Sequence, residues 1–198
     1  MDRPQLHLAS SSPRRKEILS TLGISFSFAG VDIDESRRHG EACEDMVTRL
    51  ARDKVHAVDK GRLPGLPVLG ADTIVVLDGR VFGKPDGQED ALSMLAALSG
   101  KAHRVLTAVV LEYRDRRRIA MSDTAVRFRD IHPDEALAYW QSGEPIDKAG
   151  AYAIQGLGGV FVEWVRGSYT GVVGLPVFET AALLRRAGID VLLKSNRI

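Results

Sequence analysis

The segment Leu8-Ala9-Ser10-Ser11-Ser12-Pro13-Arg14-Arg15-Lys16 combines three hydroxyl side chains with three consecutive cations. Ser12 followed by Pro13 is typical of a helix N-cap and first helical residue, so the cations fall in the first helical turn. Backbone N–H groups already make that end of a helix partly positive, so added cations are unfavourable there unless an anion joins them. The segment therefore either binds an anion, most obviously a phosphate, or directs its basic side chains into solvent.

Asp72 interrupts an apolar run from Val68 to Leu77. A carboxylate inside a buried strand is costly unless a cation or hydrogen-bond donors compensate it. Such an environment suits a general base or a metal ligand. The structural alternative is an aspartate at a strand end that pairs with a lysine.

Two lysines are candidates for such a partner or for a phosphate contact. Lys54 lies seven residues after Val47, within the apolar stripe of an expected helix. It must extend its ammonium to water, pair with an acid or meet a ligand. Lys84, in Gly83-Lys84-Pro85, follows an expected hairpin whose return strand could bring it back toward Asp72; the alternative is a surface lysine.

Two further segments could contact a ligand. Glu35, together with Asp32 and Asp34, offers oxygen ligands for Mg²⁺ or Mn²⁺, although an acidic loop can simply be solvated. The glycine-rich segment from Asp147 to Gly156 contains Gln155, whose amide both donates and accepts and so suits the edge of a base. The alternative is a glycine-rich turn that carries a surface glutamine.

Apolar spacing and turn residues predict strands that alternate with helices. At least two hairpins interrupt a purely parallel order, one of them at Asp78-Gly79, so we expect a mixed α/β sheet. Residues 144–159 are expected to form a loop. Strands are expected near residues 6–8, 24–28, 68–77, 81–82, 105–113, 119–128, 160–165 and 169–173. Helices are expected near residues 13–22, 47–58, 91–98, 133–143 and 176–184, and residues 114–118 are expected to form a charged, solvated turn.

Composition limits the classes of protein that fit. The 198 residues are 44% hydrophobic and 27% charged, as in an ordinary globular enzyme, and the net charge of +1 provides no global field for nucleic acid. Aromatic residues make up 6% and do not alternate with basic runs, which argues against a groove for single strands. A single cysteine excludes an internal disulfide and favours the reducing cytoplasm, and no apolar stretch is long enough to cross a membrane.

Taken together, these segments resemble the Maf-like family of nucleoside triphosphate pyrophosphatases over roughly Leu6 to Leu184. The order and joint presence of the short motifs are specific. They are Leu8 to Arg15, Asp34-Glu35, Leu50-Ala51 with Lys54, Gly70-Ala71-Asp72-Thr73, Gly83-Lys84-Pro85, Asp147 to Tyr152, Ile154-Gln155-Gly156 and Val173-Gly174-Leu175-Pro176.

The resemblance implies a single Maf-like domain over residues 1–198, with the elongated fold of inosine triphosphate pyrophosphatase and two lobes around a central cleft. It implies hydrolysis between the α- and β-phosphates, which yields a nucleoside monophosphate and pyrophosphate with the help of a divalent cation, and it suggests a homodimer. The family's proton acceptor falls on Asp72. Its polar cleft residues fall on Ser10, Arg14, Glu35, Lys54 and Lys84.

Three positions separate branches of the family. The branch that resembles dTTP and UTP pyrophosphatases has arginine, threonine and glutamine, and here these are Arg14, Thr73 and Gln155. The branch acting on 7-methyl-GTP typically has tryptophan, glutamine and glutamate. The resemblance thus implies pyrimidine triphosphates as substrates. A different hypothesis is a non-catalytic nucleotide-binding regulator of cell division and septum formation.

Overall fold

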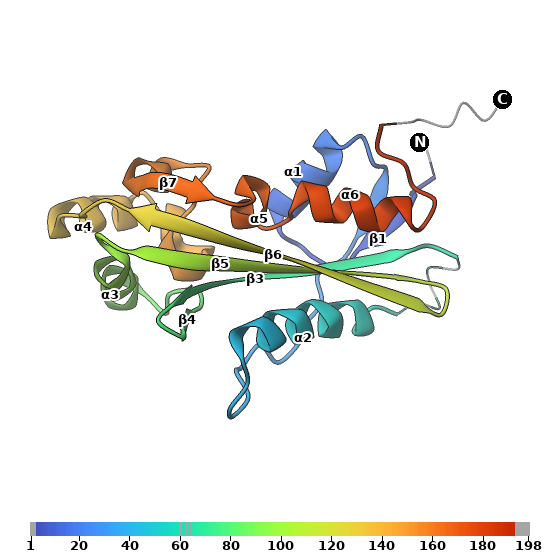
Figure 1. Ribbon diagram of the computed structural model, residues 1–198, viewed down its shortest axis with the longest axis horizontal. Coiled ribbons are helices and arrows are strands. Elements are labelled where there is room, and N and C mark those ends of the chain that lie inside the picture. Colours follow the sequence, from blue (N-terminus) through green and yellow to red (C-terminus); the bar gives the residue numbers. More distant parts are fainter. Residues whose placement is uncertain (1–2, 60, 62, 64, 193–198) are drawn as a thin grey trace. The chain divides into compact units, whose positions relative to one another are not determined.

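The computed structural model describes residues 3–59, 61, 63 and 65–192 (Figure 1). The strands are β1 (Leu6–Leu8), β2 (Phe26–Phe28), β3 (Val68–Leu77), β4 (Arg80–Phe82), β5 (Ala102–Tyr113), β6 (Arg116–Phe128) and β7 (Val162–Arg166). The α-helices are α1 (Pro13–Thr21), α2 (Cys43–His56), α3 (Gln88–Leu98), α4 (Pro133–Gln141), α5 (Tyr169–Val173) and α6 (Val177–Arg185). Short 3₁₀ helices are η2 (Glu144–Asp147), η3 (Ala149–Ala151) and η4 (Leu157–Phe161).

The strands form a mixed sheet, as the sequence predicts. Hydrogen-bonded neighbours follow the order β2-β1-β3-β5-β6-β7, and β4 pairs with β3. β1 is parallel to both β2 and β3, whereas the β3–β4 and β6–β7 pairs are antiparallel. None of the helices in the described part of the chain is long and apolar enough to cross a bilayer.

The chain divides into two compact units, each with its own apolar core. Unit 1 comprises residues 1–72, 107–121 and 174–198, and unit 2 comprises residues 73–106 and 122–173. In unit 1, Leu8, Leu69 and Leu184 belong to the core. In unit 2, Phe82 and Phe128 belong to the core, and α3 packs against α4. The prediction of a single domain over residues 1–198 stays a prediction.

One predicted strand is wrong. Residues 169–173 form the short helix α5. The cause lies just before it, because the hydroxyl of Ser168 accepts the backbone N–H of Gly171 at 3.0 Å, which is the geometry of an N-cap. Residues 144–159, expected as a loop, contain η2, η3 and the start of η4, which extends to Phe161, so the strand expected from residue 160 begins at Val162.

The charged turn predicted over residues 114–118 is shorter than expected. The turn is confined to residues 114 and 115, with Arg114 at a φ of 53°, and β6 already begins at Arg116. Two-residue turns match the twist of paired strands, so the ladder continues to the tip of the hairpin. Three of the arginines assigned to a solvated loop are therefore strand residues.

Gly70 allows α2 to lie close along β3 (Figure 1). A Cβ at this position would meet Val55 Cγ2 at 2.6 Å and the carbonyl oxygen of Ala51 at 2.7 Å. The backbone oxygen cannot move aside as a flexible side chain would, so the close approach of helix and strand requires the missing side chain. The same helix carries Lys54, and the same strand carries Asp72.

We therefore expect Gly70→Ala to destabilise the protein by about 1–3 kcal/mol, because overpacking must push α2 away from β3. Urea denaturation followed by circular dichroism measures the loss. Gly83→Ala is the matched control, since a Cβ there meets no atom within 4 Å. Equal midpoints for the two variants would contradict the packing role of Gly70.

Candidate functional site

The serine-rich segment leads from β1 into α1, and its geometry differs from the predicted cap. Ala9 donates its N–H to the carbonyl of Leu69 at 2.8 Å, which ties the segment to β3. Ser12 occupies the N-cap position but makes no side-chain cap bond. Instead, the buried hydroxyl of Ser10 accepts the N–H of Ser12 at 3.2 Å. Ser10 is thus fixed at the start of the helix whose first turn holds Arg14.

Arg15 is a candidate site residue that the sequence reasoning did not select. Its Nη1 donates to Ser10 Oγ at 3.3 Å, and its Nε donates to the carbonyl of Gly174 at 2.9 Å. Burial lowers the pKa of the Arg15 guanidinium, while the charge of Asp72 opposes this shift. The sequence signal was the run of cations at the helix start, which does not say which of them turns inward.

Lys54 connects the two candidate carboxylates of unit 1. Its Nζ donates to Asp72 Oδ1 at 2.5 Å and lies 2.8 Å from Glu35 Oε1. Lys54 and Asp72 are both buried, with 9% and 6% of their surface exposed, whereas Glu35 is exposed. Of the three outcomes considered for Lys54, pairing with an acid is the one observed. The buried carboxylate of Asp72 thereby has the cationic partner that its position demands.

Arg49 holds the loop that carries Glu35 against α2. The buried Arg49 guanidinium donates from Nε to Glu41 Oε1 at 2.6 Å and from Nη2 to Glu41 Oε2 at 2.9 Å. The same Nη2 donates to the carbonyl of Ser36 at 2.9 Å, next to Glu35. The hydrogen bond from Arg49 lowers the pKa of Glu41 to about 2. This two-pronged ion pair therefore restricts where Glu35 can lie.

The described residues fit a divalent cation only in part. No group of three or more His, Cys, Asp or Glu side chains in the described ranges is arranged to hold a metal ion. Asp72 and Glu35 do converge on one point, the Nζ atom of Lys54. Mg²⁺ is commonly bound by one or two carboxylates together with phosphate oxygens and water. The donor set thus suits a cation that arrives with a phosphate, rather than one enclosed by protein.

Thr73, Lys84 and Gln155 belong to unit 2 and are described within it. Thr73 is half-buried on β3, and Lys84 is exposed beyond the end of β4. The carbonyl of Gly83 accepts the N–H of Gly150 at 2.9 Å, which joins the Gly83-Lys84-Pro85 segment to the glycine-rich segment. Gly150 has a φ of 69°, and a Cβ there would lie 3.0 Å from a methyl group of Val75. Two of the short motifs found in the sequence therefore meet in unit 2.

A half-buried cluster around Glu144 holds the segment that carries Gln155. The Glu144 carboxylate accepts the backbone N–H groups of Leu157 and Gly158, each at 3.0 Å, and the hydroxyl of Tyr139 at 2.7 Å. Tyr139 in turn accepts the N–H of Ala153 at 3.0 Å.

Burial opposes the charged form of Glu144, but the hydrogen bonds from Gly158, Tyr139 and Leu157 outweigh it and lower its pKa. A Cβ on Gly156 would fall 2.0 Å from the carboxylate, so this glycine makes room for Glu144. Gln155 is exposed on a segment that is fixed on both sides. Sequence reasoning missed Tyr139 and Glu144 because both lie outside the glycine-rich motif.

Comparison with known proteins identifies close relatives over nearly the whole chain. A dTTP/UTP pyrophosphatase of Methylococcus capsulatus is 52% identical over 185 residues, covering 93% of this chain and 92% of its own. Proteins of the same name from Bordetella parapertussis and Hahella chejuensis are 52% and 50% identical, covering 96% of this chain and 96% and 95% of their own. A solved dITP/XTP pyrophosphatase from Mycobacterium abscessus matches 91% of this chain and 94% of its own, at 16% identity and a TM-score of 0.42.

These relatives define a class of nucleotide pyrophosphatases to which the chain is similar. The sequence model of the Maf-like protein family matches residues 5–187, and the chain belongs to that family. The resemblance inferred from the short motifs is thereby confirmed. The matched region contains every candidate residue of both units.

The Glu41–Arg49 pair predicts a specific dependence of stability on pH. The pKa of Glu41 is near its usual 4.5 when unfolded and about 2 when folded. Because the folded value is depressed, the stabilisation is fully present above pH 4.5 and is lost as the pH falls toward 2. Urea midpoints of the parent and Glu41→Gln should therefore differ at pH 7 and converge between pH 4.5 and 2.

Glu17→Gln is the control for this measurement, because Glu17 is an exposed residue of α1 in the same unit. It should leave the urea midpoint nearly unchanged across the same range of pH. A difference between parent and Glu41→Gln that did not change with pH would mean that the loop is held by contacts other than the ion pair.

Proposed function

We propose that this protein is a nucleoside triphosphate pyrophosphatase that hydrolyses dTTP and UTP to the nucleoside monophosphate and pyrophosphate. The relatives of that name are about half identical to it over nearly their full length. The observation that carries the chemical part of the proposal is the buried Asp72 carboxylate, which accepts a hydrogen bond from Lys54 and whose charge acts on Arg15. An acid beside several cations is the arrangement that hydrolysis of a phosphoanhydride needs.

In the proposed reaction, a water molecule attacks the α-phosphorus and Asp72 accepts its proton. A bond forms from the water oxygen to phosphorus, the α–β anhydride bond breaks, and pyrophosphate leaves with the electron pair. The Lys54 bond uses Asp72 Oδ1, and a carboxylate has a second oxygen that can take the proton. Arg14, Lys54 and Lys84 are proposed to bind phosphate oxygens, with Ser10 as a further polar contact.

A divalent cation, Mg²⁺ or Mn²⁺, is part of the proposal. When bound, such a cation neutralises phosphate charge and polarises the phosphoryl oxygens. Glu35 and Asp72 are the residues that would hold it, because their carboxylates converge on one point. Lys54, whose ammonium lies between these two carboxylates, would contact a phosphate oxygen of the bound substrate. Cytoplasmic location and a homodimeric state are proposed on the resemblance and on the single cysteine.

Asp72→Asn should lower pyrophosphate release from dTTP by about 10²- to 10⁴-fold, the usual contribution of a general base. The assay uses purified protein with Mg²⁺ or Mn²⁺, and a urea midpoint verifies that the variant folds. Asp78→Asn is the control, since Asp78 is exposed just beyond the same strand and should keep full activity. Turnover of Asp72→Asn within a few fold of the parent would remove Asp72 from the reaction. A parent that binds nucleotides without releasing pyrophosphate would instead indicate the regulator.

Gln155→Glu tests the proposed role of Gln155, with Arg14 and Thr73, in reading the base. A carboxylate accepts hydrogen bonds but has lost the amide donor, so one edge contact is left unpaired. We expect kcat/KM for dTTP and UTP to fall by about 10- to 100-fold. Gln141→Glu, the same change at an exposed end of α4, should leave both values unchanged. Unaltered values in Gln155→Glu would show that Gln155 does not contact the base.

A further inference from the structure

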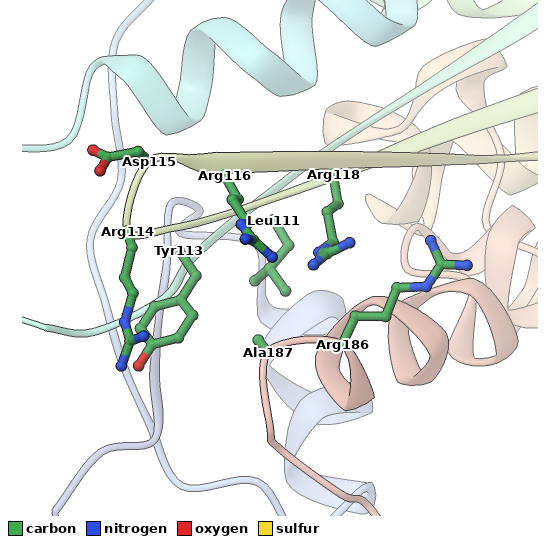
Figure 2. A pocket seen from close by; sticks show the side chains of 8 residues that line it. All are labelled: Leu111, Tyr113, Arg114, Asp115, Arg116, Arg118, Arg186 and Ala187. Atoms are coloured by element: carbon green, nitrogen blue, oxygen red, sulfur yellow. The ribbon is translucent and has the colours of Figure 1, made fainter.

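A second basic site lies at the tip of the β5–β6 hairpin, beside the end of α6 (Figure 2). It is a cavity of about 500 Å³, a size typical of small-molecule sites. Four of its eight lining residues are arginines, namely Arg114, Arg116, Arg118 and Arg186, and one is an acid, Asp115. All of them belong to unit 1, and none is among the candidate residues of the Asp72 site.

Strand alternation sorts the arginines of β6 into two groups. Arg116 and Arg118 are two residues apart, so they share one face of the strand, and Arg117 lies on the other. Figure 2 shows the guanidinium groups of Arg116 and Arg118 extending from β6 to the same side, toward Ala187. Arg117 instead donates from Nη2 to Glu112 Oε2 at 2.9 Å and contacts His56. The hairpin therefore places two like charges side by side in the cavity.

These cavity arginines differ from their neighbours in their partners. Arg117 pairs with Glu112, and Arg185 lies 3.8 Å from Asp190. Within the described residues, no ion pair involves any of the four arginines that line the cavity. The carboxylate of Asp115 lies away from Arg116 and Arg118 in Figure 2. Neighbouring guanidinium groups repel one another unless an anion joins them, and among the described lining residues Asp115 is the single acid beside four arginines.

We propose that this cavity binds an oligophosphate, either free pyrophosphate or the phosphate tail of a nucleotide. Planar guanidinium forks match phosphate oxygens and bind them in pairs. Arg114 lies over one face of the Tyr113 ring, 5.0 Å from its centre, so that face is not open to a nucleotide base. The arginines therefore offer contacts to phosphates and not to a base. The site does not depend on the function proposed for Asp72.

Calorimetric titration of the full chain with inorganic triphosphate, without a divalent cation, tests the proposal. Arg116→Gln with Arg118→Gln should weaken binding at this site by about tenfold or more, because two charge-assisted contacts are lost. Arg117→Gln with Arg185→Gln is the control, since it also removes two positive charges, one from β6 and one from α6, at residues that do not line the cavity. The control should bind as the parent does.

Two results would overturn the proposal: a parent that does not bind triphosphate at millimolar concentration, or equal binding by the cavity variant and its control. If the double variant does not fold, as judged by circular dichroism, Arg118→Gln alone repeats the comparison. Lys54→Met distinguishes triphosphate bound at the Asp72 site from triphosphate bound in the cavity. This variant should weaken binding at the Asp72 site and leave binding in the cavity unchanged. Failure of the Asp72 proposal and failure of this one are thus distinguishable.

Three further titrants identify the source of the phosphates. Equal affinity for UTP and triphosphate would indicate that the phosphate chain alone is bound, and tighter binding of UTP would indicate a nucleotide. UMP should bind more weakly than either, and equal binding of UMP would contradict an oligophosphate site. A short RNA that binds more tightly than triphosphate, and loses this in the cavity variant, would replace the proposal with a nucleic-acid surface.

Discussion

The need to compensate the buried charge of Asp72 governs the arrangement of unit 1. A carboxylate with 6% of its surface exposed requires a donor or a cation nearby, and Lys54 supplies both at 2.5 Å. Lys54 is itself buried on the apolar face of α2, so neither group would be tolerated alone. Helix and strand are therefore coupled through one ion pair. The charge of Asp72 also acts on Arg15, which donates to the hydroxyl of Ser10.

Two features of unit 1 bring the carboxylates of Asp72 and Glu35 within reach of Lys54. Gly70 lets β3 approach α2, which brings Asp72 within reach of Lys54. Arg49, on the same helix, holds the loop that carries Glu35 by pairing with Glu41 and Ser36. The absence of a side chain at Gly70 and the ion pair of Arg49 thus both help to place the carboxylates of Asp72 and Glu35 near Lys54. Preorganised charges of this kind stabilise a developing charge better than groups that must reorient.

How much the sequence could predict depended on whether the controlling interaction was local. The Asp78-Gly79 turn, the helix that starts at Pro13 and the buried strand around Asp72 follow from neighbouring residues, and the structure confirms them. The strand expected at 169–173 failed because one hydroxyl, that of Ser168, redirects the chain into a helix. The partner of Lys54 could not be chosen, because it lies 18 residues away on another element. Arg15 and Glu144 were missed for the same reason, since distant backbone groups define their roles.

The arginines of unit 1 show why the net charge of +1 is a poor guide to where anions bind. Arg49 is satisfied by Glu41, Arg117 by Glu112, and Arg15 by a hydroxyl and a carbonyl. The guanidinium groups of these three arginines are thus engaged by groups of the protein itself. Arg116 and Arg118 flank Arg117 in the sequence but face the cavity, so a two-residue period decides which charges are matched. An anion responds to these local differences, because charges beyond about 8–10 Å are largely screened in physiological salt.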